Sequence, residues 1–180
     1  MQRHELEHLI RAAAQVTDEY EFVVIGSQSI LGSIENPPAE CVMSNEADIF
    51  PMNAEDKSDL IDGAIGEGSQ FHDAHGYYAQ GVDSRTAILP TGWRDRLTRL
   101  QSRRTDDRVA YCLDVLDLFM SKCAANREKD RSFNKALLAH GFISMEAALA
   151  RLADMPVSDQ KKAAMAALIG RLAREAREAS

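Results

Sequence analysis

Residues 21–32 have the sequence EFVVIGSQSILG, and this stretch decides the fold class. Its first five residues form a short apolar run rich in β-branched side chains, which favours a buried strand over a helix. Gly26 ends the run, and the residues after it open a short helix. A glycine lets backbone N–H groups approach a ligand closely, and a helix start presents unpaired donors. Gly26 and Ser27 are therefore candidates for binding phosphate, although a tight turn that binds nothing remains the alternative.

A second strand is predicted over residues 46–50, where Ala47 and Ile49 alternate with Glu46 and Asp48 before Pro51 ends the run. Period-two geometry places both carboxylates on one face of the strand. Two ionised carboxylates repel one another, and a divalent cation relieves the repulsion. Oxygen ligands of this kind suit Mg²⁺ that bridges nucleotide phosphates. The alternative is an acidic strand face in contact with solvent.

A helix is predicted from Asp114 onward. Val115, Leu118, Phe119 and Lys122 are spaced so that they share one face of this helix. The apolar face therefore ends in a cation that can reach a phosphate at the edge of the core. A lysine that keeps its head in water is the common alternative. Asp130 lies in the charged run 127–131, for which solvated pairing along a helix is the ordinary explanation.

The rest of the chain predicts an α/β (α+β) fold with a mixed sheet of about five strands flanked by helices. Further helices are expected over 4–17, 54–65 with Asn53 as N-cap, and 93–100; further strands over 77–82, 86–89 and 108–113; and a loop over 35–43. From Asp114 the pattern is helical, with Pro156 dividing it. We expect a nucleotide-binding type of α/β core at residues 1–113 and a helical region at 114–180, packed together as one compact unit.

The composition narrows the function classes. The 180 residues include 21 Lys and Arg against 28 Asp and Glu, a net charge of −7, which argues against nonspecific coating of nucleic acid or anionic membrane. No apolar run approaches the ~20 residues that span a bilayer, so no membrane contact is expected. The polar start differs from a signal peptide, and the three cysteines lack CxxC spacing. A cytoplasmic location follows as the expectation.

Three other features have a functional and an ordinary interpretation. Residues 94–108 hold six arginines and three aspartates, either a landing site for RNA or triphosphate or a salt-bridged helix. His72 and His75 are either a metal pair or part of a polar loop. Trp93 either stacks on a base or packs in the core.

The Gly26-Ser27 turn, the Glu46 and Asp48 strand and the segment from Lys122 to Asp130 follow one another in an order that resembles the polymerase-β-like nucleotidyltransferase superfamily. The later segment is similar to the lysine helix and Arg-x-x-Asp element of the bacterial AbiEii-like and uncharacterised minimal nucleotidyltransferases. The resemblance covers roughly residues 20–140.

This resemblance implies an enzyme that moves a nucleotidyl group from an NTP such as ATP to a hydroxyl of RNA, tRNA included, or of a protein. Gly26 and Ser27 would hold the triphosphate, and Glu46 and Asp48 would hold Mg²⁺. Lys122 would contact the nucleotide phosphates, and Asp130 would be a third acidic or base-like residue.

The resemblance also implies a role and a partner. Small enzymes of this type are often toxins of toxin–antitoxin or phage-defence pairs, which implies a cognate antitoxin. Glu46 stands where these families usually have Asp, and eighteen residues separate Ser27 from Glu46, more than is usual. The alternative function is therefore a catalytically degenerate module that binds a nucleotide or a protein partner.

Overall fold

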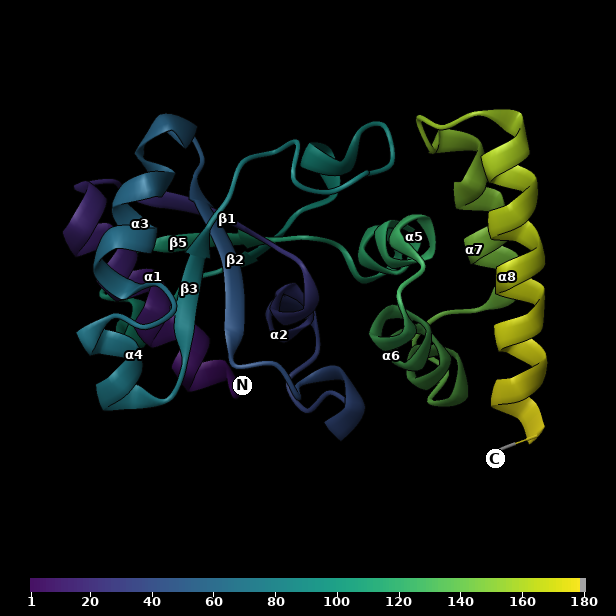
Figure 1. The fold of residues 1–180 in the computed structure, drawn as a ribbon, viewed down its shortest axis with the longest axis horizontal. Helices are drawn as coiled ribbons and strands as arrows, with labels where there is room; N and C mark the ends of the chain where they lie inside the picture. Colours follow the sequence, from purple (N-terminus) through teal and green to yellow (C-terminus); the bar gives the residue numbers. More distant parts are fainter. Residues whose placement is uncertain (179–180) are drawn as a thin grey trace.

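One mixed sheet forms the centre of the fold in the computed structural model, which describes residues 1–178 (Figure 1). Its strand order is β3-β2-β1-β5-β4. The central strand β1 runs antiparallel to β2 and parallel to β5, while β3 is parallel to β2 and β4 is antiparallel to β5. The strands are β1 Glu21–Ile25, β2 Glu46–Pro51, β3 Tyr78–Gly81, β4 Thr98–Leu100 and β5 Val109–Cys112.

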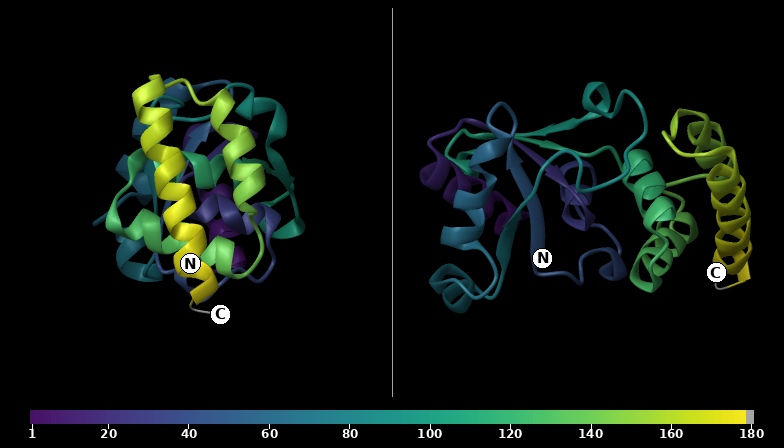
Figure 2. Two further views of the ribbon diagram at one scale, coloured as in Figure 1. Left: turned by 90° about the vertical axis from the view of Figure 1, so that its right-hand side faces the viewer. Right: turned by 45° about the horizontal axis from the view of Figure 1, so that its top comes forward.

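Helices cover both faces of the sheet. Those on one side are α1 Arg3–Thr17, α3 Ser58–Ile65 and α4 Gln70–His75, and those on the other are α2 Ile30–Ser33 and α5 Val115–Ala125 (Figure 1). Beyond α5 the chain continues as α6 Glu128–Ala139, α7 Met145–Arg151 and α8 Asp159–Glu178, and α8 packs across α6 and α7 as the outermost helix (Figure 2). Residues 179–180, the end of the predicted helical region, lie outside the described residues. No helix within residues 1–178 has the length and apolar character needed to cross a membrane.

The two strands that decide the fold form as their patterns predict. Phe22, Val23 and Val24 are fully buried in β1 because the strand is central and helices cover both of its faces. In β2, Ala47 and Ile49 are fully buried, whereas Glu46 and Asp48 on the opposite face are partly exposed. The predicted α/β fold with its helical C-terminal region is confirmed.

Three local predictions were wrong. Helix α3 begins at Ser58 after a 3-10 turn over Glu55–Lys57, so Asn53 is not its cap. Residues 86–89 form irregular chain instead of a strand, and 93–100 is a 3-10 turn followed by β4 instead of a helix. Pairing with β5 explains why residues 98–100 form a strand, because it buries Leu100 opposite Ala110 in a ladder that the local sequence does not encode.

A buried aspartate joins the irregular segment to the helical region. Asp117 of α5 is fully buried and accepts a hydrogen bond from Arg96 Nε at 2.8 Å and another from Arg151 Nη1 of α7. Arg96 also donates to the Thr91 carbonyl at 3.0 Å. One carboxylate therefore holds three segments that are far apart in the sequence.

Replacing Asp117 with alanine is expected to destabilise the fold by about 3 kcal/mol, because the partly buried Arg96 loses its counter-ion and Arg151 keeps only the longer pair with Asp154, at 3.5 Å. Urea denaturation followed by circular dichroism measures the change. Asp73→Ala, at an exposed position on α4, serves as the matched control and should shift the unfolding free energy by less than about 0.5 kcal/mol. Equal effects of the two substitutions would contradict the role given to Asp117.

Candidate active site

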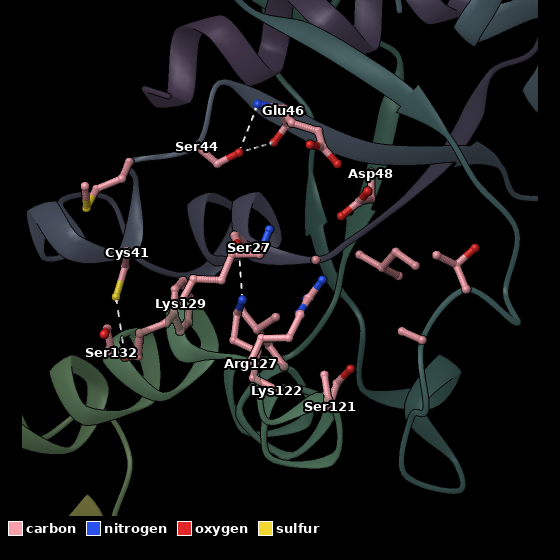
Figure 3. A pocket seen from close by; sticks show the side chains of 18 of the residues that line it. Ser27, Cys41, Ser44, Glu46, Asp48, Ser121, Lys122, Arg127, Lys129 and Ser132 are labelled. Atoms are coloured by element: carbon pink, nitrogen blue, oxygen red, sulfur yellow. Dashed lines mark hydrogen bonds between the residues drawn. The ribbon is translucent and has the colours of Figure 1, made fainter. Parts of the chain in front are cut away.

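A cavity of about 760 Å³ lies where the sheet meets α5 and α6 (Figure 3). Its walls come from segments that are distant in sequence: the turn after β1, the exposed face of β2, the irregular segment around residue 87 and the two helices. The residues that the argument below uses are Gly26, Ser27, Glu46, Asp48, Lys122, Arg127 and Lys129, all of which line it.

The turn after β1 is shaped by its contact with Asp48. Gly26 has φ +67°, a left-handed conformation that residues with a side chain rarely adopt. A Cβ atom at this position would lie 1.9 Å from Asp48 Oδ2. The close approach follows from the register of the sheet, which pairs Ile25 with Asp48. Glycine is therefore required here for two independent reasons, and the Gly26-Ser27 turn and the Asp48 carboxylate form one unit.

The two carboxylates of β2 face the cavity together. Burial raises the pKa of Asp48 to about 7, and the negative charge of Glu46 and a hydrogen bond with it add to the effect. Glu46 is held in place by the Tyr78 hydroxyl, which donates to Glu46 Oε2 at 3.1 Å. The extra methylene of Glu46 therefore does not carry its carboxylate away from Asp48.

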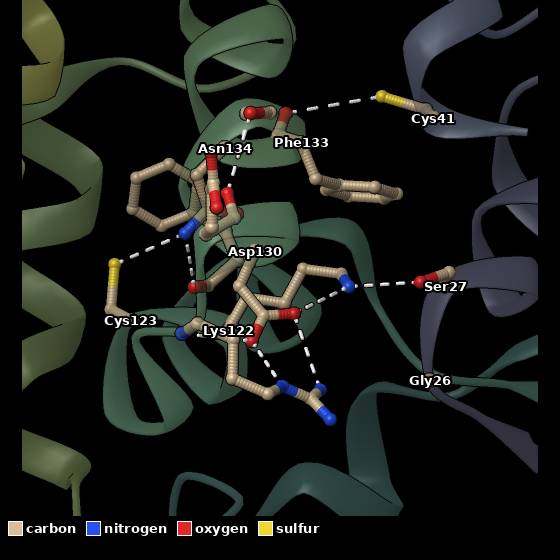
Figure 4. A network of polar contacts seen from close by, with 12 residues as sticks. Gly26, Ser27, Cys41, Lys122, Cys123, Asp130, Phe133 and Asn134 are labelled. Carbon is tan, nitrogen blue, oxygen red and sulfur yellow. Dashed lines mark hydrogen bonds and ion pairs between the residues drawn. The ribbon is translucent and has the colours of Figure 1, made fainter. Parts of the chain in front are cut away.

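Lys122 reaches the same cavity from α5. Its Nζ atom donates to Ser27 Oγ at 2.9 Å and to Asp130 Oδ1 at 3.2 Å, and it lies 4.2 Å from the centre of the Phe133 ring (Figure 4). The side chain is only 7% exposed, so its ammonium group does not lie in bulk water as the common alternative would have it. Burial lowers the pKa of Lys122, and the charge of Asp130 opposes that shift.

Asp130 lies behind the cations and does not line the cavity. It is fully buried, and its Oδ2 atom accepts hydrogen bonds from Arg127 Nε at 2.7 Å and from the Arg127 backbone N–H at 3.2 Å. Burial acts to raise the pKa of Asp130, but the bonds from Arg127 and the charge of Lys122 bring it below its ordinary value. Its geometry favours orienting Lys122 and Arg127, in place of the acid or base function implied by the resemblance.

Two further cations face the carboxylates. Arg127 and Lys129 line the cavity at the start of α6, and the positive charge of Lys129 acts on Asp48. Sequence reasoning assigned neither a role, because both lie in a charged run that is typical of a solvated helix end. The sequence feature that could have pointed to them is their position, because Arg127 precedes Asp130 by three residues and Lys129 precedes it by one.

Comparison with known families supplies an independent finding. A family described as nucleotidyltransferase of unknown function (DUF6036) matches residues 4–168. The chain belongs to this family. Comparisons with curated proteins and with solved structures gave no match.

The remaining candidates of this nucleotidyltransferase family member lie away from the cavity. Trp93 is half-buried against the core with the Arg94 guanidinium 4.7 Å from its ring centre. His72 and His75 belong to helix α4, and not to the expected loop. Within residues 1–178 no three His, Cys, Asp or Glu side chains gather as a metal site. None of the arginines of 94–108 lines this cavity.

We expect Asp48→Asn to stabilise the protein at pH 8 in the presence of a chelator of divalent cations. The pKa of Asp48 is raised in the folded state, so the folded protein binds this proton more tightly than the unfolded chain. The stability that this proton binding contributes is fully present below about pH 4, and it is lost as the pH rises through 7. Asparagine avoids that loss, which is on the order of 4 kcal/mol, because the pKa rises from 3.8 to about 7 and each pKa unit corresponds to about 1.4 kcal/mol.

Urea denaturation at several pH values tests this expectation. The advantage of Asp48→Asn over the unchanged protein should shrink as the pH is lowered towards 4. Asp73→Asn, at an exposed site, should show no such trend. If the two proteins differed in unfolding free energy by the same amount at pH 4 and at pH 8, the pKa of Asp48 would not be raised in the folded state.

Proposed function

We propose that this protein is a Mg²⁺-dependent enzyme that transfers the nucleotidyl group of an NTP, such as ATP, to a hydroxyl of RNA or of a protein. The observation that supports it is the shared cavity, in which the glycine-serine turn and the carboxylate pair face the cations of α5 and α6. A volume of about 760 Å³ is within the range that small-molecule sites occupy.

The cations are placed to receive the triphosphate. Ser27 Oγ and Lys122 Nζ are already joined at 2.9 Å, so both atoms lie within reach of one phosphate group. Arg127 and Lys129 add positive charge on the same side. When the oxygen of an acceptor hydroxyl forms its bond to the α-phosphorus, its proton passes to solvent water, and the bond between phosphorus and the bridging oxygen of pyrophosphate breaks. Preorganised cations stabilise the charge that develops on that leaving group.

The carboxylates fit a divalent cation. Mg²⁺ is commonly held by one or two carboxylates together with substrate phosphates, and Glu46 and Asp48 supply such a partial set. The raised pKa of Asp48 supports the fit, because burial and the neighbouring charge of Glu46 both disfavour the free carboxylate, and a bound cation would offset both. Bound there, Mg²⁺ would neutralise phosphate charge and orient the attacking oxygen.

Asp130 supports catalysis by holding other groups in place. Its two oxygens contact Lys122 and Arg127, so the two cations are fixed relative to each other before a nucleotide binds. Such preorganisation avoids the reorganisation that flexible side chains would require during the reaction. Asp130 is therefore a positioning residue in this proposal.

The contact between Glu46 and Asp48 favours an enzyme over the degenerate module. A degenerate site needs no matched pair of carboxylates, whereas here Tyr78 holds Glu46 and the pKa of Asp48 responds to it. In the enzyme, the longer Glu46 side chain takes the place of the usual aspartate.

Calorimetry with ATP and Mg²⁺ tests the binding step. Asp48→Asn should abolish the Mg²⁺-dependent part of the affinity, because one carboxylate holds the cation poorly. Lys122→Met keeps the apolar stem beside Phe133 but loses a charge-assisted contact, which predicts about tenfold weaker binding. Asp73→Asn is the control.

Transfer of label from α-³²P NTPs to total RNA or to protein then separates enzyme from module. The proposed enzyme labels one of them, and Asp48→Asn does not. If the protein bound NTP but labelled neither RNA nor protein, the degenerate module would be the better interpretation. If it bound no NTP at millimolar concentration, both interpretations would be wrong.

The resemblance to AbiEii-like proteins extends the proposal to a toxin with a cognate antitoxin. Induced expression should then arrest bacterial growth, and Asp48→Asn at equal expression should relieve the arrest because the cavity and fold persist without the chemistry. Counting viable cells after induction measures the effect. Growth unaffected by the active protein would separate the enzyme from the toxin role.

A further inference from the structure

A second cavity, of about 800 Å³, adjoins the segment over residues 41–44. Cys41, Met43 and Ser44 line the first cavity, whereas Val42 lines the second. The second cavity is also lined by Arg3 and His4 at the start of α1 and by Arg103 and Arg104 of the 3-10 turn Arg103–Thr105. Its arginine side chains therefore come from two segments that lie about a hundred residues apart in the sequence.

The arginine-rich stretch 94–108 divides into engaged and free side chains. Arg94 pairs with Glu55, Arg96 with Asp117, and Arg99 with Gln101, while Arg108 lies over the Tyr20 ring. The guanidinium groups of Arg103 and Arg104 have no hydrogen-bond or ion-pair partner within residues 1–178, and neither does that of Arg3. The three free guanidinium groups all line the second cavity.

The turn that carries Arg103 and Arg104 is fixed to α1. Arg11 Nη1 donates to the Arg104 carbonyl at 2.8 Å, and Ser102 Oγ donates to Glu7 Oε1 at 2.9 Å. Thr105, fully buried beneath the turn, donates to the Arg108 carbonyl at 2.7 Å. Because the backbone is held on both sides, the two guanidinium groups extend from a rigid base.

We propose that this second cavity is a phosphate-binding site, separate from the nucleotide cavity. Three arginines against Glu7 and Glu35 leave a net charge of +1 with His4 neutral. Glu7 is buried and accepts a hydrogen bond from the Ser102 hydroxyl. Glu35 is exposed, as are Arg103 and Arg104, so solvent screens these charges alike, whereas Arg3 is partly buried. Arginine is the side chain best suited to phosphate, because its planar fork offers paired donors.

The ligand is a phosphate group, either a phosphodiester of an RNA strand or a phosphate that is free in solution. The site does not depend on the proposed transfer reaction, because none of its arginines lines the first cavity. An RNA strand that bound there would lie beside the segment 41–44, which both cavities share.

The first experiment measures binding of a fluorescein-labelled oligouridylate by anisotropy at several salt concentrations. Arg3→Gln, Arg103→Gln and Arg104→Gln should each weaken binding about fivefold and reduce the salt slope by about 0.7, the value for one phosphate contact on a single strand. Glu35→Gln should tighten binding about twofold. Arg99→Gln removes the same charge from the same stretch outside both cavities and is the matched control.

The second experiment titrates inorganic phosphate while the arginine Nε–Hε resonances are followed by NMR. It is done in Lys122→Met protein, so that phosphate in the nucleotide cavity contributes little. Shifts at Arg3, Arg103 and Arg104, with none at Arg99, are the expected result.

The outcomes separate the two sources. Loss of oligouridylate binding in the three variants, but not in Arg99→Gln, supports an RNA strand as the ligand. Phosphate-induced shifts without any dependence of oligouridylate binding on these arginines support a free phosphate. The site is overturned if neither signal depends on the three arginines, or if Arg99→Gln has an equal effect.

Discussion

The contact of Lys122 with Ser27 and Asp130 joins the sheet to the helical region, and the cavity exists because of it. Lys122 extends from α5 to the turn after β1, while Asp130 comes from α6. The three groups belong to separate elements, so their contact fixes the distance between the sheet edge and both helices. If either charge of the Lys122–Asp130 pair were removed, the other would be left buried without a counter-ion, which is costly. The pair therefore constrains how the helices can pack against the sheet.

The carboxylate pair places a different constraint on the same cavity. Glu46 and Asp48 repel one another, and the left-handed turn at Gly26 brings the backbone against Asp48. Neither feature benefits the empty fold, because a neutral side chain and an ordinary turn would be more stable. A cluster of costly features around one cavity is typical of a site that serves a ligand.

The charge of the whole chain gives little indication of where anions bind. The net charge is −7, yet cations line both cavities. Lys122, Arg127 and Lys129 gather through helix packing, and Arg3 meets Arg103 and Arg104 because a short turn is fastened to α1. The electrostatic potential at a point on the surface depends on which nearby charges lack a counter-ion. An ion pair such as Arg96 with Asp117 contributes little to it, because the two charges cancel.

The sequence by itself determined β1, β2 and the start of α5, because hydrophobic periodicity is a local property. It also placed Gly26, Glu46, Asp48 and Lys122 correctly on their elements. The tertiary structure alone decided that β4 replaces the expected helix, that Asp130 lies behind the cations, and that Arg127 and Lys129 face the carboxylates. These outcomes depend on pairing and packing between distant segments, whose free energies no local pattern contains.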